Sequence, residues 1–281
     1  MDNDESNECL FGSLMDIIGQ TNIYNDILYI ENNELVYNSE NISESLKGKL
    51  EKIGVNERKN LIPIFSKENL KKIGSNESIK IPEAGNLFFY FSESANYILE
   101  NDINLNCDEN DQWIPIDNLK GSFDANWHFI DGIYINNQLE HQGLFRNNEG
   151  KICNLTVAGF ISCAKGGGIV GHNKGIIEKC INKVEVVGNS GNCGGICSEN
   201  YDEGIIQYCC NMADISCQNG VAGIAAWNHG KKTKISYCFN KGNIKGYQGS
   251  GGIVSFIGSS NELGGTIRMV LQYWKNIRKY C

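Results

Sequence analysis

The sequence predicts an all-β chain wound into a right-handed parallel β-helix of about six coils. From Gly167 onward it can be written in rows that open on Gly-Gly-Ile or an equivalent: GGIVGHNKGIIEKCINKVEVVG, GGICSENYDEGIIQYCCNMADISC and AGIAAWNHGKKTKISYCFNKGNIKG. The opening isoleucines and an internal cysteine recur every 27 to 29 residues: Ile169, Ile196, Ile224 and Ile253, with Cys180, Cys209 and Cys238. A composition of 32 Gly, 3 Pro and 41% hydrophobic residues favours turn-rich β-structure over a helical bundle. A period of this length is typical of a solenoid whose coils pair only with their neighbours.

Each row therefore corresponds to one coil, and alternation along a strand predicts which side chains point inward. Counting from Cys180, the residues Asn182, Val184 and Val186 share its face. Polar Asn is expected inside because its amide can bond the Asn of the coils above and below, at a spacing of roughly 4.8 Å. The sequence predicts a buried amide ladder of Asn182, Asn211 and Asn240.

The repeated cysteines allow two interpretations. The coil spacing would let neighbours form a disulfide, but three in a row cannot all pair. An inward Cys beside Ile and Val behaves as a small hydrophobe, so we expect Cys180, Cys209 and Cys238 to be buried thiols, with disulfides as the alternative.

The rows resemble the GLUG-type repeats of bacterial surface proteins, in which a Gly-Gly-Leu/Ile-Val-Gly-x-Asn run is followed by Ile-x-Asx-Cys. Upstream segments resemble the leading coils of the same proteins: YILENDINL, QWIPI, GSFDANWHFIDGIYI and GLFRNNEGKICNL. The likeness covers about residues 97–267 and implies a right-handed parallel β-helix exposed at a bacterial surface. The chain departs from the family pattern at Ala125, Trp127 and Arg146, which affects local turns and not the fold.

The sequence suggests four segments. Residues 1–62 alternate between acidic, Asn-rich stretches and short apolar runs, with a helix expected over 43–54, and form a small mixed appendage. Residues 63–96 are a capping segment in which Ser66 caps a short helix and Leu70 and Ile73 cover the open end of the solenoid. The parallel β-helix occupies 97–267.

The tail 268–281 loses the Gly, Asn and Cys markers and carries four basic residues and no acid. Reading AT-rich codons one nucleotide later from Arg268 can give Glu-Trp-Cys-Tyr-Asn-Ile-Gly, which matches the markers of the preceding coil. We therefore expect the tail not to continue the solenoid and treat a frameshift as one explanation, with chance as the other. A solenoid that ends at 267 would leave a strand edge open to self-association.

The charge pattern excludes some partners. A net charge of −8 with no clustered Lys and Arg argues against nucleic acid and anionic membranes. There is no apolar run long enough to enter a membrane, and the first residues do not resemble an export signal, so a surface location requires a signal outside this chain.

Neither a metal site nor a catalytic site is predicted. Cys193 with Cys197, and Cys209 and Cys210 with Cys217, lack the spacing of a zinc site, and no His is in register with them. Asp124, His128 and Asp131 lie in a turn motif, for which a structural role is expected. His172 and His229 occupy different registers and His141 stands in a polar loop, so each is expected to be solvated. No cofactor is predicted.

The remaining candidate is an outward stripe in which Tyr208 and Tyr237 precede the ladder cysteines and Phe239 follows one, in line with Ile181 and Cys210. Outward aromatics on successive coils can stack on sugar rings or meet a flat protein surface; the alternative is ordinary half-exposed strand residues. The sequence thus favours a non-catalytic surface or secreted scaffold, adhesin-like, that binds a glycan or protein through Tyr208, Tyr237 and Phe239. The alternatives are a polysaccharide lyase or epimerase on the same fold, and a cysteine-based metal or redox protein.

Overall fold

The computed structural model describes residues 28–31, 34–37, 56–57, 61–258 and 265–272, in two units divided between Asn60 and Leu61. In the first unit, β1 (Leu28–Glu31) pairs antiparallel with β2 (Glu34–Tyr37), which pairs parallel with β3 (Asn56–Glu57). The helix expected over 43–54 lies outside the described residues. No helix within the described ranges is long and apolar enough to cross a bilayer.

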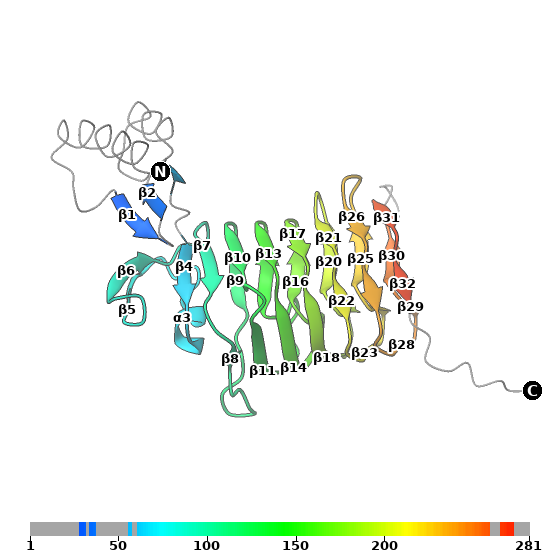
Figure 1. Ribbon diagram of the computed structural model, residues 1–281. Helices are drawn as coiled ribbons and strands as arrows, with labels where there is room; N and C mark the ends of the chain where they lie inside the picture. The colour runs from blue at the N-terminus through cyan, green and yellow to red at the C-terminus, as the bar shows by residue number, and fades with distance from the viewer. Residues whose placement is uncertain (1–27, 32–33, 38–55, 58–60, 259–264, 273–281) are drawn as a thin grey trace, which may run out of the picture. The chain divides into compact units, whose positions relative to one another are not determined.

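The second unit is a right-handed parallel β-helix, which confirms the predicted fold class (Figure 1). Its first sheet stacks one short strand from each coil: β4 (Leu61–Ile64), β7 (Asn96–Leu99), β10 (Ser122–Asp124), β13 (Lys151–Cys153), β17 (Ile176–Glu178), β21 (Ile205–Gln207), β26 (Lys234–Ser236) and β31 (Thr266–Arg268).

The second sheet follows it around each coil, through β8 (Ile103–Asn104), β11 (Phe129–Asn136), β14 (Thr156–Cys163), β18 (Ile181–Gly188), β22 (Cys210–Asn211), β27 (Phe239–Asn240) and β32 (Leu271–Gln272), with β23 (Ile215–Cys217) and β28 (Ile244–Gly246) beside them. Between the second and the third sheet, each of four coils adds a short strand to a small fourth sheet. Its strands are β15 (Gly166–Gly167), β19 (Cys193–Gly194), β24 (Gly220–Ala222) and β29 (Gly249–Gly251).

The third sheet closes each coil with β9 (Ile116–Leu119), β12 (Phe145–Asn148), β16 (Val170–Asn173), β20 (Cys197–Tyr201), β25 (Ala225–His229) and β30 (Val254–Ile257). Six complete coils therefore run from β7 to β30, as the row spacing predicts, with β4 before them and the partial turn of β31 and β32 after them.

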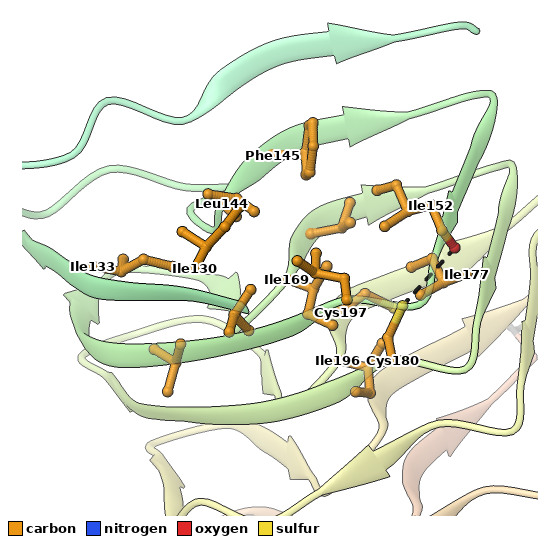
Figure 2. Packing of buried hydrophobic residues seen from close by; sticks show 14 of the residues in the cluster. Ile130, Ile133, Leu144, Phe145, Ile152, Ile169, Ile177, Cys180, Ile196 and Cys197 are labelled. Atoms are coloured by element: carbon orange, nitrogen blue, oxygen red, sulfur yellow. Dashed lines mark hydrogen bonds between the residues drawn. The ribbon is translucent and has the colours of Figure 1, made fainter. Parts of the chain in front are cut away.

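The repeat residues form the core. Ile169, Ile196 and Ile224 are fully buried and Ile253, in the last coil, is half-buried. Figure 2 shows Ile169, Ile196, Ile177, Cys180 and Cys197 pointing into the shared interior from two successive coils. Like residues at the same position in successive coils thus stack into one continuous apolar column. No single coil could bury these residues alone.

The predicted amide ladder is confirmed. Asn182, Asn211 and Asn240 are fully buried and in register. Asn182 Nδ2 donates to Asn211 Oδ1 at 2.8 Å, and Asn211 Nδ2 donates to Asn240 Oδ1 at 2.7 Å. Each Nδ2 also donates to the backbone carbonyl two residues ahead, which holds the corner of its own coil.

A second amide ladder lies where the third sheet leads into the first sheet of the next coil, and it was not predicted. It runs Asn148, Asn173, Asn200 and Asn228, all fully buried, with Nδ2 to Oδ1 distances of 2.8, 2.7 and 2.7 Å. The solenoid is therefore held at two corners by hydrogen bonds between like side chains, in addition to its sheets.

The N-terminal end of the solenoid carries the expected short helix, α3 (Lys67–Lys71). Ser66 Oγ accepts from the backbone N of Asn69, and Leu70 and Ile73 are buried. An antiparallel hairpin of β5 (Ser78–Ile81) and β6 (Leu87–Tyr90) follows. Strand pairing begins at Leu61, because β4 pairs with β7, so the boundary placed at 62 and 63 falls inside a strand of the solenoid.

At the C-terminal end, the solenoid continues past the predicted boundary at 267. Arg268 pairs with Ser236, and Leu271 and Gln272 pair with Phe239 and Asn240. The expectation that the tail leaves the solenoid at 268 is wrong as far as Gln272, because side chains unlike the markers still fit the register; residues 273–281 lie outside the described part.

Candidate functional site

The predicted tyrosines occupy the corner between the first and second sheets. Tyr208 and Tyr237 are 52% and 48% exposed, and their rings are stacked with centroids 4.9 Å apart and planes 7° apart. Both have φ of +56°, a left-handed conformation that bulky residues rarely adopt and that costs roughly 1–2 kcal/mol each. The same left-handed corner recurs at Asn154, Lys179 and Met269 in neighbouring coils.

This geometry limits what the tyrosine corner offers a ligand. Each ring turns one face toward the other, so the hydroxyls, the ring edges and the outer faces remain. Phe239 in β27 is half-buried, and so are Ile181 in β18 and Cys210 in β22. The apolar stripe beside the tyrosines is therefore partly covered.

The structure brings together a larger set of rings on the outer side of the third sheet. We call it the ring row: His141, His172, Tyr201, His229, Trp227 and Phe256. Successive centroids are 4.0, 4.7, 5.7, 4.9 and 6.4 Å apart. His141 comes from the loop between β11 and β12, and the others from β16, β20, β25 and β30.

The expectation of isolated, solvated histidines is therefore wrong for the ring row. His172 pairs with Glu199, which pairs in turn with Trp227, whereas His229 pairs with Tyr201. His172 and His229 do differ in register, as the sequence predicts, but the ring of Tyr201 lies between them and contacts both imidazoles. His141 packs over Gly171, where an added Cβ would come within 2.5 Å of the His141 backbone.

A buried charge cluster lies at the His141 end of the ring row. The Glu199 side chain is only 9% exposed, and its two oxygens contact Lys165 and His172. Burial alone would raise the pKa of Glu199, but hydrogen bonds from His172 and Lys165 outweigh it and hold the pKa at about 2. Glu199 thus stays ionised, and its charge is balanced by the neighbouring groups.

Desolvation, helped by His172 and Lys165, lowers the pKa of His141 from 6.5 to about 4. Its folded pKa lies below the unfolded value, so its contribution to stability is present above pH 6.5 and is lost as pH falls to 4. We expect the urea midpoint to fall over this window, and to fall less in His141→Asn, which cannot titrate and suits the left-handed φ of +56°. Equal losses in both proteins would contradict the assignment.

A groove lies at the other end of the ring row. It encloses about 500 Å³, is open to solvent, and is lined by Asn192, Asn219, Gln248, Trp227, Phe256, Ile257 and Gly258. Trp227 Nε1 donates to the carbonyl of Gly258 at 2.8 Å, and Asn192 Oδ1 accepts from the backbone N of Gly220 at 3.0 Å. The lining is uncharged and combines two aromatic rings with amides from three successive coils.

The remaining polar candidates have structural roles. Asp124 accepts from Asn126 N and Asn154 Nδ2, and Asp131 accepts from Gly132 N. His128 Nδ1 lies 3.0 Å from Asp102 Oδ1. No group of three or more His, Cys, Asp or Glu side chains in the described ranges is placed to hold a metal ion.

Comparison with known proteins supports the fold only. No family model and no curated protein matches the chain. A crystal structure from Bacteroides ovatus, described as a "putative immunoglobulin A1 protease", is similar, with a TM-score of 0.55 and 18% identity over 76% of this chain and 84% of that one. At this identity the likeness shows a shared β-solenoid architecture and nothing about chemistry.

Proposed function

We propose that this protein is a non-catalytic, adhesin-like scaffold, surface-bound or secreted, that holds an extended glycan along the third sheet. The observation that carries the proposal is the groove, which Trp227 and Phe256 line together with the amides of Asn192, Asn219 and Gln248. Aromatic rings supply apolar area at low entropic cost, and amides supply both donors and acceptors for sugar hydroxyls. The likeness of the rows to GLUG repeats favours the same setting.

The coil spacing suits a polymer better than a single sugar. Trp227 and Phe256 occupy the same register on adjacent strands, and the ring row continues through His229, two residues along β25, to Tyr201 on the preceding coil. A ligand with repeating units can therefore meet aromatic rings on successive coils. Because the groove lining is uncharged, we infer that neutral sugars fit it better than uronates.

Binding of the full chain to immobilised polysaccharides tests the proposal. The panel holds neutral glucans, mannans and chitin oligomers, uronate polymers, and unglycosylated protein as the competing ligand class. Saturable binding to a neutral glycan is expected. Binding to protein alone, or to no member of the panel, would count against a glycan ligand.

A polysaccharide lyase is the second candidate, and one observation favours it. The low pKa of His141 keeps its imidazole neutral beside the His172 and Glu199 pair, so it offers a basic nitrogen within the ring row. Against it, Lys165 is already paired with Glu199 and so is poorly placed to neutralise a uronate. Rising ultraviolet absorbance from unsaturated product on uronate polymers would establish the lyase and overturn the scaffold proposal.

The tyrosine corner remains a predicted second contact surface. The double variant Tyr208→Ala and Tyr237→Ala removes the stacked rings but touches few buried groups, so its melting temperature should stay within about 2 °C of the wild type. If the corner binds the ligand, the Kd should rise at least tenfold. Unchanged affinity would assign these residues to the coil surface alone.

A further inference from the structure

Three cysteines meet where the second and fourth sheets adjoin, and we call them the corner thiols: Cys163, Cys193 and Cys217. All are buried. Cys163 pairs with Gly188 at the end of β18, and the register from Val187 to Ser216 places Cys217 next in the same column. Cys193 approaches this column from β19.

Gly188 leaves the gap in which two of these sulfurs meet. A Cβ at Gly188 would stand 2.4 Å from Cys193 Sγ and 2.5 Å from Cys217 Sγ. Both sulfurs therefore lie around the one point that a side chain would fill, and no side chain separates them. Cys163 Sγ lies in the same corner: it contacts the Cys193 thiol and stands 2.8 Å from the position that a Cβ at Gly166 would take.

The internal cysteine ladder provides a contrast. Cys180, Cys209 and Cys238 occupy one register, and each thiol lies closest to the carbonyl two residues before it, at 3.1, 3.2 and 3.3 Å, whereas the carbonyl of the preceding coil is farther away, at 3.9, 3.6 and 3.7 Å. Cys217 Sγ donates across coils, to the carbonyl of Gly191 at 2.6 Å, and so lies directly against the segment that carries Cys193.

We propose that Cys193 and Cys217 form a cross-coil disulfide when the protein folds in the presence of a disulfide oxidant. Each thiol loses a proton, the S–S bond forms by thiol–disulfide exchange through a mixed disulfide, and the two electrons reduce the small-molecule disulfide to two thiols. The bond would close a short loop within the solenoid. It would also pin the segments of Asn192 and Asn219, two of the groove amides.

The burial of the two thiols determines when, during folding, the Cys193–Cys217 bond forms. The contact with Cys193, together with desolvation, raises the pKa of Cys217, and the contact with Cys163 and desolvation raise that of Cys193. The thiolate is the reacting form, so the folded protein reacts slowly and the bond forms before the corner closes.

Refolding with reduced and oxidised glutathione tests the proposal. The full chain carries Cys9→Ser and Cys281→Ser, so that only the solenoid cysteines remain. After alkylation of free thiols and digestion at Lys and at acidic residues, we expect a linked pair of peptides containing Cys193 and Cys217. Cys209 and Cys238 are the matched control pair and should be alkylated. The melting temperature should exceed that of the reduced protein by on the order of 5 °C.

Two further variants separate the outcomes. Cys163→Ser should leave the linked pair intact, whereas Cys217→Ser should remove both the link and the gain in melting temperature. Complete alkylation of the wild-type chain after oxidative refolding would overturn the proposal, as would a bond between Cys163 and Cys193 or within the internal ladder.

Discussion

Replacing Trp227 with Ala is expected to weaken glycan binding by about 10- to 100-fold, since central aromatic residues carry most of the affinity of a binding surface. Trp227 lines the groove, contacts both His229 and Phe256, and is held in place by its bond to the Gly258 carbonyl. Its removal deletes the central ring of that surface. Titration calorimetry with the best neutral oligosaccharide measures the change.

Trp127→Ala is the matched control for this prediction. Trp127 is 70% exposed in the turn between β10 and β11, and it does not line the groove. Its replacement should leave the Kd unchanged. Equal losses in the two variants would mean that binding depends on general surface hydrophobicity, and unchanged binding in Trp227→Ala would mean that the glycan does not bind in the groove.

Asn211→Leu is expected to destabilise the solenoid by about 3 kcal/mol, because an unpaired buried polar group costs about 1–3 kcal/mol. Asn182 Nδ2 loses its acceptor, Asn240 Oδ1 loses the hydrogen from Asn211, and the Ala213 carbonyl loses a donor. The larger side chain also meets Gly195, whose Cβ position lies 2.5 Å from the Asn211 amide. Urea unfolding followed by circular dichroism measures the loss.

Asn110→Leu is the control for this loss, because its side chain is exposed in the loop before β9. Its unfolding midpoint should be near that of the wild type. If Asn211→Leu unfolds at the wild-type midpoint, the amide ladder contributes nothing measurable to stability.

The sequence was sufficient for the coil and its interior. Ile169, Cys180 and Asn182 recur at nearly constant spacing because each must stack on its equivalent, so spacing alone sets their register. The second ladder was open to the same argument, since Asn173, Asn200 and Asn228 recur at 27 and 28 residues, but their mixed neighbours obscured the pattern.

The outer surface could not be predicted in the same way. The ring row crosses two registers, and His141 reaches it from a loop, so no fixed spacing marks it. The meeting of Cys193 with Cys217 depends on the missing side chain of Gly188, which a list of cysteine spacings does not show. Outward residues need not match from coil to coil, and only the folded chain shows which of them meet.

A crystal structure of the protein with its best-binding neutral oligosaccharide tests whether the groove holds the glycan. We expect sugar rings against Trp227 or Phe256, with hydroxyls bonded to amides of Asn192, Asn219 or Gln248, and further units extending along the third sheet. A groove left empty, with the ligand bound only at the tyrosine corner or on another face, would contradict glycan binding by the third sheet.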